Sequence, residues 1–520
     1  MKFKIAPSAR ALKMADSLSI RDLIAQCICP YYTGEKRGPF GAMFIGHEIE
    51  QAKERIKIAK GDCAIPPLIT SDMECGPGKM VRGLTKFPDM MSLGAANDET
   101  LAYEVGKATA LEGAWMGYNW TLAPCVDLCE NPDSPVVSGR TPGRDPQRVI
   151  RITGSYIRGL QDHQMMATMK HFPGDGFTPY DQHLTTVYNP LSMEEWRKQS
   201  GKVFGQLVET GVMAVMPGHI GLPAYDERDS ETGMFPPATI SKKLKVDLLR
   251  SELGFEGLIV SDDIGMGGVS GFRNYYECCA LFWETGGDCL LFARVSEHFY
   301  KEMERFLKSG FLKEATLRNR AARIIAVKEH LGLLDSPAAV PVYDKEKHRE
   351  LSNRVIEKSA TLVRNRKGII PFSLTKKSKV LHLILSTKLE EEKEIHERFT
   401  QALAKVAGVV DEKVAPGSEW LHEAAISGGY DLIVCSLGTQ NRYGTSVVRM
   451  YGEVCRNLMG GWMHLGVPVI FVSHFHPFVH REYEAVMDTV INTYRTLDFT
   501  CDYLVRGITG TVKFIGQYPG

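Results

Sequence analysis

The stretch from Lys170 to His183 holds two histidines, two aspartates and one lysine within fourteen residues. Two prolines and two glycines in the same stretch exclude a long helix and predict a loop. The residues just before it, 165–169, form a short and mainly apolar run that is typical of a buried strand. A loop rich in titratable groups after such a strand is a candidate active site, although a polar surface loop without a function would have the same composition.

Asp181 and His183 are separated by one residue at the end of this stretch. A carboxylate that holds one ring nitrogen of a histidine fixes its tautomer and raises its proton affinity. The pair is therefore interpreted as a general acid that can later act as a base. Asp175, in the middle of the stretch, has no role that the pattern explains.

Asp262 follows another apolar run and is itself followed by Asp263. Adjacent side chains of an extended chain point to opposite sides, so the two carboxylates should not act as a contacting pair. A carboxylate fixed at the end of a strand can be a nucleophile towards an electrophilic carbon or a metal ligand. Asp72 and Glu74 keep the metal interpretation open. No set of His, Asp and Glu has a recognisable metal spacing, and we expect neither a metal nor a cofactor.

Short apolar runs alternate with amphipathic stretches from about residue 18 to 335. This alternation predicts a parallel sheet with crossover helices, and the number of units suits an α/β fold of the (β/α)8 TIM-type barrel. The carboxyl ends of barrel strands meet on one face, where four polar residues that follow apolar runs would share a pocket: Asp72, His171, His219 and Asp262. The predicted strands are 40–45, 66–70, 120–124, 165–170, 212–216, 257–260 and 289–292.

A second alternating region occupies residues 351–520 and predicts a smaller C-terminal α/β domain with a doubly wound sandwich. A linker-like composition at 336–350 separates it from the predicted catalytic domain, residues 1–335. In the second domain, strands are expected at 379–385, 432–435, 468–472 and 486–491, and helices at 388–406, 417–427 and 447–464.

Composition excludes several classes of protein. Lys plus Arg and Asp plus Glu each number 62, so the formal net charge is zero and nothing favours binding to nucleic acid or to an anionic membrane. The N-terminal residues lack the apolar run of a signal peptide, and no segment is long enough for a membrane helix. The twelve cysteines show neither a disulfide framework nor a zinc spacing. A cytoplasmic protein with reduced thiols, either a monomer or a homodimer, is expected.

The chain resembles glycoside hydrolase family 3, and within it the β-N-acetylglucosaminidase branch. The sequence K-H-F-P-G at 170–174, followed by D-x-H at 181–183, matches a signature that is highly specific for this branch. Further similarity extends through the first domain, in the opening helix (19–26), the D-x-E-x-G strand end (69–76), the segment 122–127, the arginine loop (139–146) and the nucleophile segment (257–266).

This resemblance implies a retaining, exo-acting β-N-acetylhexosaminidase that acts on a small β-linked carbohydrate. Asp262 would attack the anomeric carbon and form a covalent glycosyl-enzyme. His183, oriented by Asp181, would protonate the leaving oxygen and then activate water. The residues implied in binding the sugar are Asp72, Arg140, Lys170 and His171, and His219 and Met266 are further candidates for substrate binding.

Three departures from the family pattern line the presumed substrate pocket. Asp175 stands where histidine is expected, 75–80 replaces Gly-Gly-Arg-Val, and 141–143 replaces a serine and an aromatic residue. Other β-glycosidase specificities therefore stay open. A β-glycoside phosphorylase also stays open, because a histidine acid/base repels phosphate less than a carboxylate does. A substrate-assisted reaction and a sugar-binding protein on an inactive barrel are further alternatives.

Overall fold

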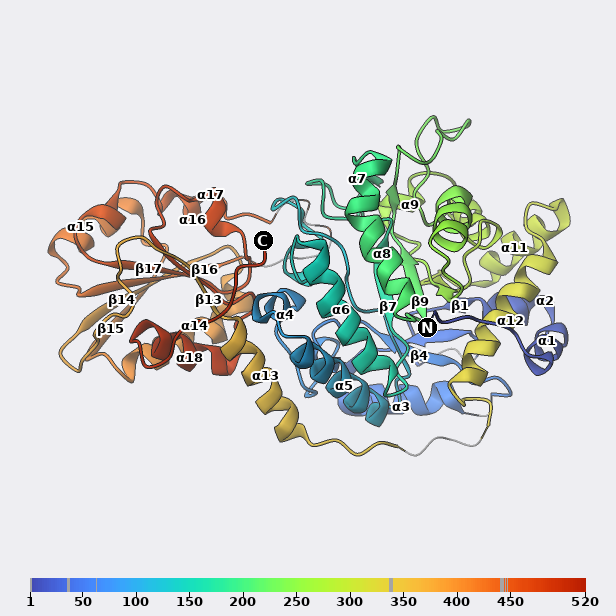
Figure 1. Cartoon of the computed structure of the whole chain (residues 1–520), viewed down its shortest axis with the longest axis horizontal. Coiled ribbons are helices and arrows are strands. Elements are labelled where there is room, and N and C mark those ends of the chain that lie inside the picture. The colour runs from blue at the N-terminus through green and yellow to red at the C-terminus, as the bar shows by residue number, and fades with distance from the viewer. Residues whose placement is uncertain are drawn as a thin grey trace. The chain divides into compact units, whose positions relative to one another are not determined.

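The computed structural model describes residues 2–520 except for 35–37, 62, 336–339, 440–443, 445 and 447. Contacts divide the chain into two units, which are considered separately (Figure 1). The first unit comprises Met1–Phe87, Glu99–Val137 and Pro146–His348, and the second comprises Pro88–Asp98, Ser138–Asp145 and Arg349–Gly520. Part of the predicted linker, 336–339, lies outside the described residues, and its last residues begin helix α13 (Lys345–Ser359).

The first unit contains a closed ring of parallel strands, which is a TIM-type barrel. Ladders join the strands in the order β1–β2–β4–β6–β7–β9–β11–β12, and β12 returns to β1. Three of these links are single bridges beside the strands, at Tyr31–Phe44, Trp120–Met166 and Val260–Cys289. The strands are β1 (Ile28–Cys29), β2 (Ala42–Phe44), β4 (Leu68–Ser71), β6 (Trp120–Thr121), β7 (Thr168–Phe172), β9 (Ala214–Pro217), β11 (Leu258–Ile259) and β12 (Leu290–Leu291).

Helices connect the barrel strands, as the alternating pattern predicts. They are α1 (Ala9–Asp16), α2 (Ile20–Gln26), α3 (Ile49–Lys60), α5 (Glu99–Met116), α6 (Pro146–Gln161), α7 (Met193–Lys198), α8 (Ser200–Glu209), the π-helix η3 (Lys243–Glu252), α9 (Gly267–Ser270), α10 (Tyr275–Glu284), α11 (Glu297–Ser309) and α12 (Glu314–His330). Short elements lie in the loops: β3 (His47–Glu48), η1 (Pro77–Lys79), β5 (Val81–Arg82), β8 (Val187–Tyr188) and β10 (Ile220–Gly221).

Strand β1 closes the barrel and was not predicted. Its two residues, Ile28 and Cys29, follow helix α2 after a single residue. So short an apolar segment cannot be distinguished from the end of an amphipathic helix by its periodicity. The pairing of β1 with β12, which joins positions far apart in the chain, defines it as a strand.

The second unit contains a six-stranded sheet in the order β13–β18–β17–β16–β14–β15, parallel except for the β13–β18 pair. Apolar residues fill both faces, with residues of α14 and α18 in one cluster and residues of α15 and η4 in the other. Helices α14 and α18 lie on one side of the sheet and α15 on the other (Figure 1). This is the expected doubly wound arrangement. The elements are α4 (Met90–Ala96), η2 (Ser138–Arg140), α13, β13 (Thr361–Asn365), β14 (Lys379–Ser386), α14 (Leu389–Ala404), β15 (Val409–Val414), α15 (Ser418–Ser427), β16 (Leu432–Gly438), α16 (Glu453–Arg456), η4 (Trp462–His464), β17 (Val469–Ser473), α17 (Val479–Glu482), β18 (Thr489–Asn492) and α18 (Asp498–Ile508).

The long helix predicted over 447–464 is wrong for the described part of that range. Only α16 and the single turn η4 form there. Gly452, Gly460 and Gly461 have φ values of 64°, 80° and 66°. Such left-handed backbone ends a right-handed helix and is easily adopted only by glycine.

Two histidines are buried in the core of the second unit. His382 and His474 both place Nε2 against Oγ of Ser436, at 2.8 and 2.9 Å. Their Nδ1 atoms lie 2.7 Å from the hydroxyls of Thr400 and Thr496. The serine hydroxyl has one hydrogen, so it donates to one ring and accepts from the other, which suits two neutral imidazoles. Burial lowers the pKa of His382 to about 3, and it lowers the pKa of His474 well below its ordinary value.

We expect acid to destabilise this unit between pH 6.5 and about 3. The pKa of His382 lies near 6.5 in the unfolded chain and near 3 in the folded unit, so stability is lost as pH falls through this window. Within this window, each such histidine lowers the free energy of unfolding by about 1.4 kcal/mol for every unit by which the pH falls. Denaturant titrations at several pH values should give a shallower pH dependence for His382→Asn. The exposed His422 supplies a matched control, His422→Asn, which should keep the wild-type slope. If the stability of His382→Asn depended on pH as steeply as that of the wild type, His382 would not be the source of this pH dependence.

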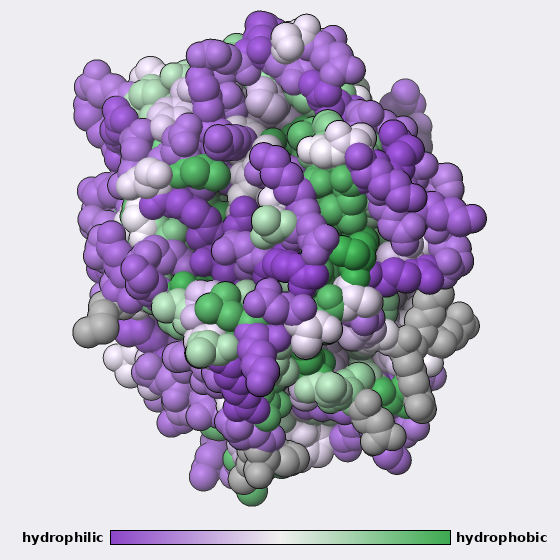
Figure 2. All heavy atoms as spheres, turned by 90° about the vertical axis from the view of Figure 1, so that its right-hand side faces the viewer, coloured by the Kyte–Doolittle hydropathy of each residue, from purple (hydrophilic) through white to green (hydrophobic). Residues whose placement is uncertain are grey.

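No helix in the described part of the chain is long and apolar enough to cross a membrane. Figure 2 shows one face of the molecule, on which hydrophilic side chains predominate and hydrophobic ones form separate patches. Single exposed apolar residues are normal on such a surface.

Candidate active site

Asp262, the expected nucleophile, follows Ile259, the last residue of β11, at the carboxyl end of the barrel. Its side chain is 16% exposed, so a ligand can reach the carboxylate. Oδ1 accepts a hydrogen bond of 2.8 Å from the backbone N–H of Asp263. Oδ2 lies 3.8 Å from Nε2 of His171. That separation is too long for a hydrogen bond, and the two side chains form an ion pair when the imidazole is protonated.

The two adjacent carboxyl groups have pKa values shifted in opposite directions. Burial raises the pKa of Asp263, and the charge of Asp262 also raises it. Burial acts to raise the pKa of Asp262 too, but nearby basic side chains outweigh this and hold it at about 2; they are His171, His219, His183 and Lys170. Asp262 is therefore ionised throughout the physiological range, as a carboxylate nucleophile must be.

Lys170 lies within β7, which extends two residues beyond its predicted end. Its Nζ is 3.0 Å from Oδ1 of Asp72 and 3.0 Å from Oε1 of Glu74. Glu74 also forms an ion pair with Lys79. Lys170 and Glu74 are buried, whereas the side chain of Asp72 is 22% exposed. Asp72 is thus the member of this cluster that a sugar hydroxyl can reach with a charge-assisted hydrogen bond.

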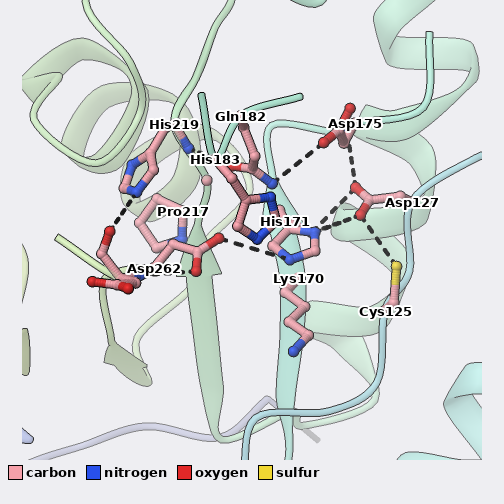
Figure 3. A network of polar contacts seen from close by, with 12 residues as sticks. Cys125, Asp127, Lys170, His171, Asp175, Gln182, His183, Pro217, His219 and Asp262 are labelled. Carbon is pink, nitrogen blue, oxygen red and sulfur yellow. Dashed lines mark hydrogen bonds and ion pairs between the residues drawn. The ribbon is translucent and has the colours of Figure 1, made fainter. Parts of the chain in front are cut away.

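His171 comes directly after Lys170, yet both side chains lie at the site (Figure 3). The ladder between β7 and β9 shifts at this point, because Lys170 pairs with Met216 and Phe172 pairs with Pro217. His171 is the extra residue of a bulge. A bulge redirects a side chain and allows two neighbours in the sequence to serve one site.

Asp127 is a buried carboxylate that orients His171. Its Oδ2 accepts a hydrogen bond of 2.7 Å from Nδ1 of His171, and its Oδ1 accepts one of 2.8 Å from the backbone N–H of Asp175. Burial acts to raise the pKa of Asp127, but His171 and these N–H groups outweigh it and lower the pKa. Because Nδ1 is bound to Asp127, Nε2 of His171 faces Asp262. Asp127 received no role from the sequence, since local spacing does not encode a contact between distant segments.

Asp181 and His183 contact each other, as the D-x-H spacing suggests. Oδ1 of Asp181 lies 2.6 Å from Nδ1 of His183 and also accepts its backbone N–H at 2.9 Å. Asp181 is buried, whereas the side chain of His183 is 21% exposed. A ligand can therefore reach the imidazole but not the carboxylate, an arrangement that suits a general acid/base. The catalytic roles of both residues stay predictions.

The loop that carries this dyad is attached to the segment after Asp262. The backbone N–H of Gly267 donates to the carbonyl of His183 at 2.8 Å, and that of Gly268 donates to the carbonyl of Gln182 at 3.2 Å. A Cβ on Gly268 would lie 2.5 Å from the Gln182 carbonyl oxygen, so any side chain there would push the loop away. The dyad and the nucleophile segment are thus held together by backbone contacts.

His219 is fully buried and contacts the nucleophile segment (Figure 3). Its Nε2 donates to the backbone carbonyl of Asp263 at 2.9 Å, and its Nδ1 lies 2.8 Å from Oγ1 of Thr239. Burial lowers the pKa of His219 and favours the neutral ring. Both ring nitrogens bind protein atoms, so this geometry favours a supporting role over the predicted contact with the sugar.

The remaining predicted substrate residues are Met266 and Arg140. Met266 is 7% exposed and immediately precedes α9. Arg140 ends η2, which belongs to the second unit. Contact of either residue with a substrate stays a prediction.

Among the described residues, Cys125, Asp127 and His171 form a group whose possible ligand atoms all lie within 4.8 Å of one another. Cys125 and His171 both hydrogen-bond to Asp127, at 3.2 and 2.7 Å. These hydrogen bonds account for the buried positions of the three side chains. We assign no metal to them.

Comparison with known proteins identifies the family of this chain. The profile of the glycosyl hydrolase family 3 N-terminal domain matches residues 43–327. A β-N-acetylglucosaminidase/β-glucosidase from Cellulomonas fimi is 28% identical over 498 residues, which cover 92% of this chain and 88% of that protein.

Two solved structures resemble the whole chain. The β-glucoside phosphorylase BglX has a TM-score of 0.89 and 26% identity, with coverage of 100% of this chain and 97% of that one. A family 3 β-N-acetylglucosaminidase from Paenibacillus sp. str. FPU-7 has a TM-score of 0.81 and 26% identity, with coverage of 97% and 99%. With the barrel and its polar site, these matches establish that the chain belongs to glycoside hydrolase family 3 and is a glycoside hydrolase.

Proposed function

We propose that this protein is a retaining, exo-acting β-N-acetylhexosaminidase with preference for N-acetylglucosaminides. The ionised, partly exposed Asp262 carries the proposal, because a carboxylate of this kind can attack an anomeric carbon. The relatives from Cellulomonas fimi and Paenibacillus are both named as β-N-acetylglucosaminidases, which supports the choice of sugar. Asp72, which is partly exposed and held by the buried Lys170, supplies a hydrogen-bond acceptor for a hydroxyl of the terminal sugar.

The reaction has two displacements. In the first, an oxygen of Asp262 bonds to the anomeric carbon while the glycosidic C–O bond breaks, and His183 gives a proton to the leaving oxygen. In the second, His183 removes a proton from water, which attacks the same carbon and releases Asp262. Two inversions give overall retention. A histidine here replaces the usual acid/base carboxylic acid, and Asp181 stabilises the imidazolium form.

A panel of aryl β-glycosides tests this proposal. The N-acetylglucosaminide should have the highest kcat/KM, ahead of the N-acetylgalactosaminide, glucoside and xyloside. Proton NMR of the first product should show the β-anomer before mutarotation. Initial release of the α-anomer would contradict retention, and a faster reaction with the glucoside would contradict the sugar assignment. Absence of turnover throughout the panel would contradict the proposed activity.

Phosphorolysis is a second candidate, because the phosphorylase BglX matches the chain over its whole length. The negative charge of Asp262 disappears when the glycosyl ester forms. His183, which has by then given its proton to the leaving group, adds no negative charge, so neither group repels phosphate in the second displacement. Formation of sugar 1-phosphate with phosphate present, measured against release of the free sugar, distinguishes this candidate from hydrolysis.

A cytoplasmic location is proposed on the basis of the cysteines. All twelve are thiols, and ten of them are buried. Thiols that persist without pairing are typical of a reducing compartment.

A further inference from the structure

Behind the catalytic groups, four polar side chains form a continuous buried chain of hydrogen bonds (Figure 3). Asp127 accepts from the backbone N–H of Asp175 at 2.8 Å. Oδ2 of Asp175 accepts from Nε2 of Gln182 at 3.3 Å, and Oε1 of Gln182 accepts from the backbone N–H of His219 at 2.8 Å. His219 continues the chain through its ring to the backbone carbonyl of Asp263. The loops after β6, β7, β9 and β11 are thereby connected.

These side chains are too buried to touch a substrate. Asp127 and Asp175 are 1% and 2% exposed, and Gln182 and His219 are fully buried. Buried polar groups that are fully paired fix a local structure, and they are costly when one partner is lost.

The orientation of the Gln182 amide follows from its partners. A backbone N–H can only donate, so the atom facing His219 must be the carbonyl oxygen Oε1. The NH2 group then faces Asp175, whose carboxylate can only accept. Oδ1 of Asp175 also accepts the backbone N–H of Gly176 at 2.6 Å. Each atom of the Asp175–Gln182 contact therefore has a defined donor or acceptor role.

Gln182 stands between the two members of the proton-transfer dyad, Asp181 and His183. Its side chain is anchored through Asp175 to Asp127, which orients His171, and through His219 to the nucleophile segment. Its carbonyl is held by Gly268. A displacement of Gln182 would move His183 relative to Asp262.

We infer that Asp175 and Gln182 are positioning residues that set the separation between the acid/base His183 and the nucleophile Asp262. This inference rests on the proposed two-step mechanism. It also gives Asp175 a role: its carboxylate anchors the side chain of Gln182, the residue that precedes His183. A misplacement of about 1 Å at a reacting group can cost about 100-fold in rate.

A pair of isosteric substitutions tests the inference. Asp175→Asn places an NH2 group against the NH2 group of Gln182, and Gln182→Glu places a carboxylate against the carboxylate of Asp175. The double variant D175N/Q182E restores one donor and one acceptor, keeps Oδ1 for Gly176 and Oε1 for His219, and conserves the net charge. Gln182→Met removes the hydrogen bonds of this side chain to Asp175 and to His219 without adding a charge. This variant replaces Gln182→Glu in the test if the charged variant does not fold.

The readout is kcat/KM for a phenyl glycoside and a 2,4-dinitrophenyl glycoside of the sugar that reacts best in the panel. The single variants should lose about 10- to 100-fold with the phenyl substrate, whose departure needs the proton of His183, and less than about threefold with the dinitrophenyl substrate. The double variant should recover most of the loss. Equal losses on both substrates, or no recovery in the double variant, would overturn the inference.

Amide hydrogen exchange gives a measurement that does not depend on activity. Exchange at the backbone N–H of His219 should accelerate in both single variants and return to the wild-type rate in the double variant. If the wild type hydrolyses no glycoside, the proposed function fails while this measurement still tests the chain of contacts. An unchanged exchange rate at His219 in both single variants would refute the positioning role of Asp175 and Gln182.

Discussion

Asp262→Asn is expected to lower kcat/KM for aryl β-glycosides by at least about 10⁴-fold, because it removes the atom that bonds to the anomeric carbon. Asparagine keeps the shape of the side chain and can still accept the N–H of Asp263. The fold should therefore persist, as circular dichroism and thermal unfolding can show. Azide, a small nucleophile, should restore turnover of a dinitrophenyl glycoside and give an α-glycosyl azide.

Asp263→Asn is the matched control for this substitution. The pKa of Asp263 is raised by burial, and its Oδ1 accepts the N–H of Gly265, a hydrogen bond that asparagine can retain. Its kcat/KM should stay within about tenfold of the wild type. A 2-fluoro sugar should leave a covalent label on the peptide that contains Asp262, located by fragmentation in the mass spectrometer. Label on Asp263 would contradict the assignment and make Asp263 the nucleophile. Absence of label together with retained activity in Asp262→Asn would contradict the mechanism and favour the substrate-assisted alternative.

The position of Asp262, the proposed nucleophile, was predictable because it follows from a simple rule about barrels. Buried parallel strands have continuous apolar sequences, and catalytic side chains follow their carboxyl ends. Asp72, His219 and Asp262 conform to this rule. His171 does not, because β7 extends through it and a bulge brings it to the site. A bulge depends on the pairing between strands and has no signature in the local sequence.

The supporting contacts were less predictable than the reactive groups. The Asp181–His183 contact spans two residues and is visible as D-x-H, whereas Asp127 meets His171 across 44 positions. Asp175 remained unexplained from the sequence because its partners, Asp127 and Gln182, approach it only after the loops are placed. Sequence spacing thus indicated the groups that are proposed to react, whereas the folded structure was needed to find the residues that contact and hold them.

His183→Ala is expected to lower kcat/KM by about 10²- to 10⁴-fold for a phenyl glycoside, because the leaving oxygen would depart without a proton. A 2,4-dinitrophenolate leaves without protonation, so formation of the glycosyl-enzyme from that substrate should be little affected. Hydrolysis of the glycosyl-enzyme should then become slow, because water must attack the anomeric carbon without a base. A burst of dinitrophenol followed by a slow steady state in stopped-flow measurements would show this change of rate-limiting step.

Asp181→Asn separates the two members of the dyad. Asparagine can still accept the Nδ1–H of His183 through its carbonyl oxygen, so the ring orientation should persist. Loss of the negative charge removes the electrostatic stabilisation of positive charge on His183 during proton transfer, so kcat/KM for the phenyl glycoside should fall by about 10- to 100-fold. The burst phase with the dinitrophenyl substrate should show no such loss. Absence of a burst in His183→Ala, or an unchanged kcat/KM for the phenyl glycoside in Asp181→Asn, would mean that another group handles the proton.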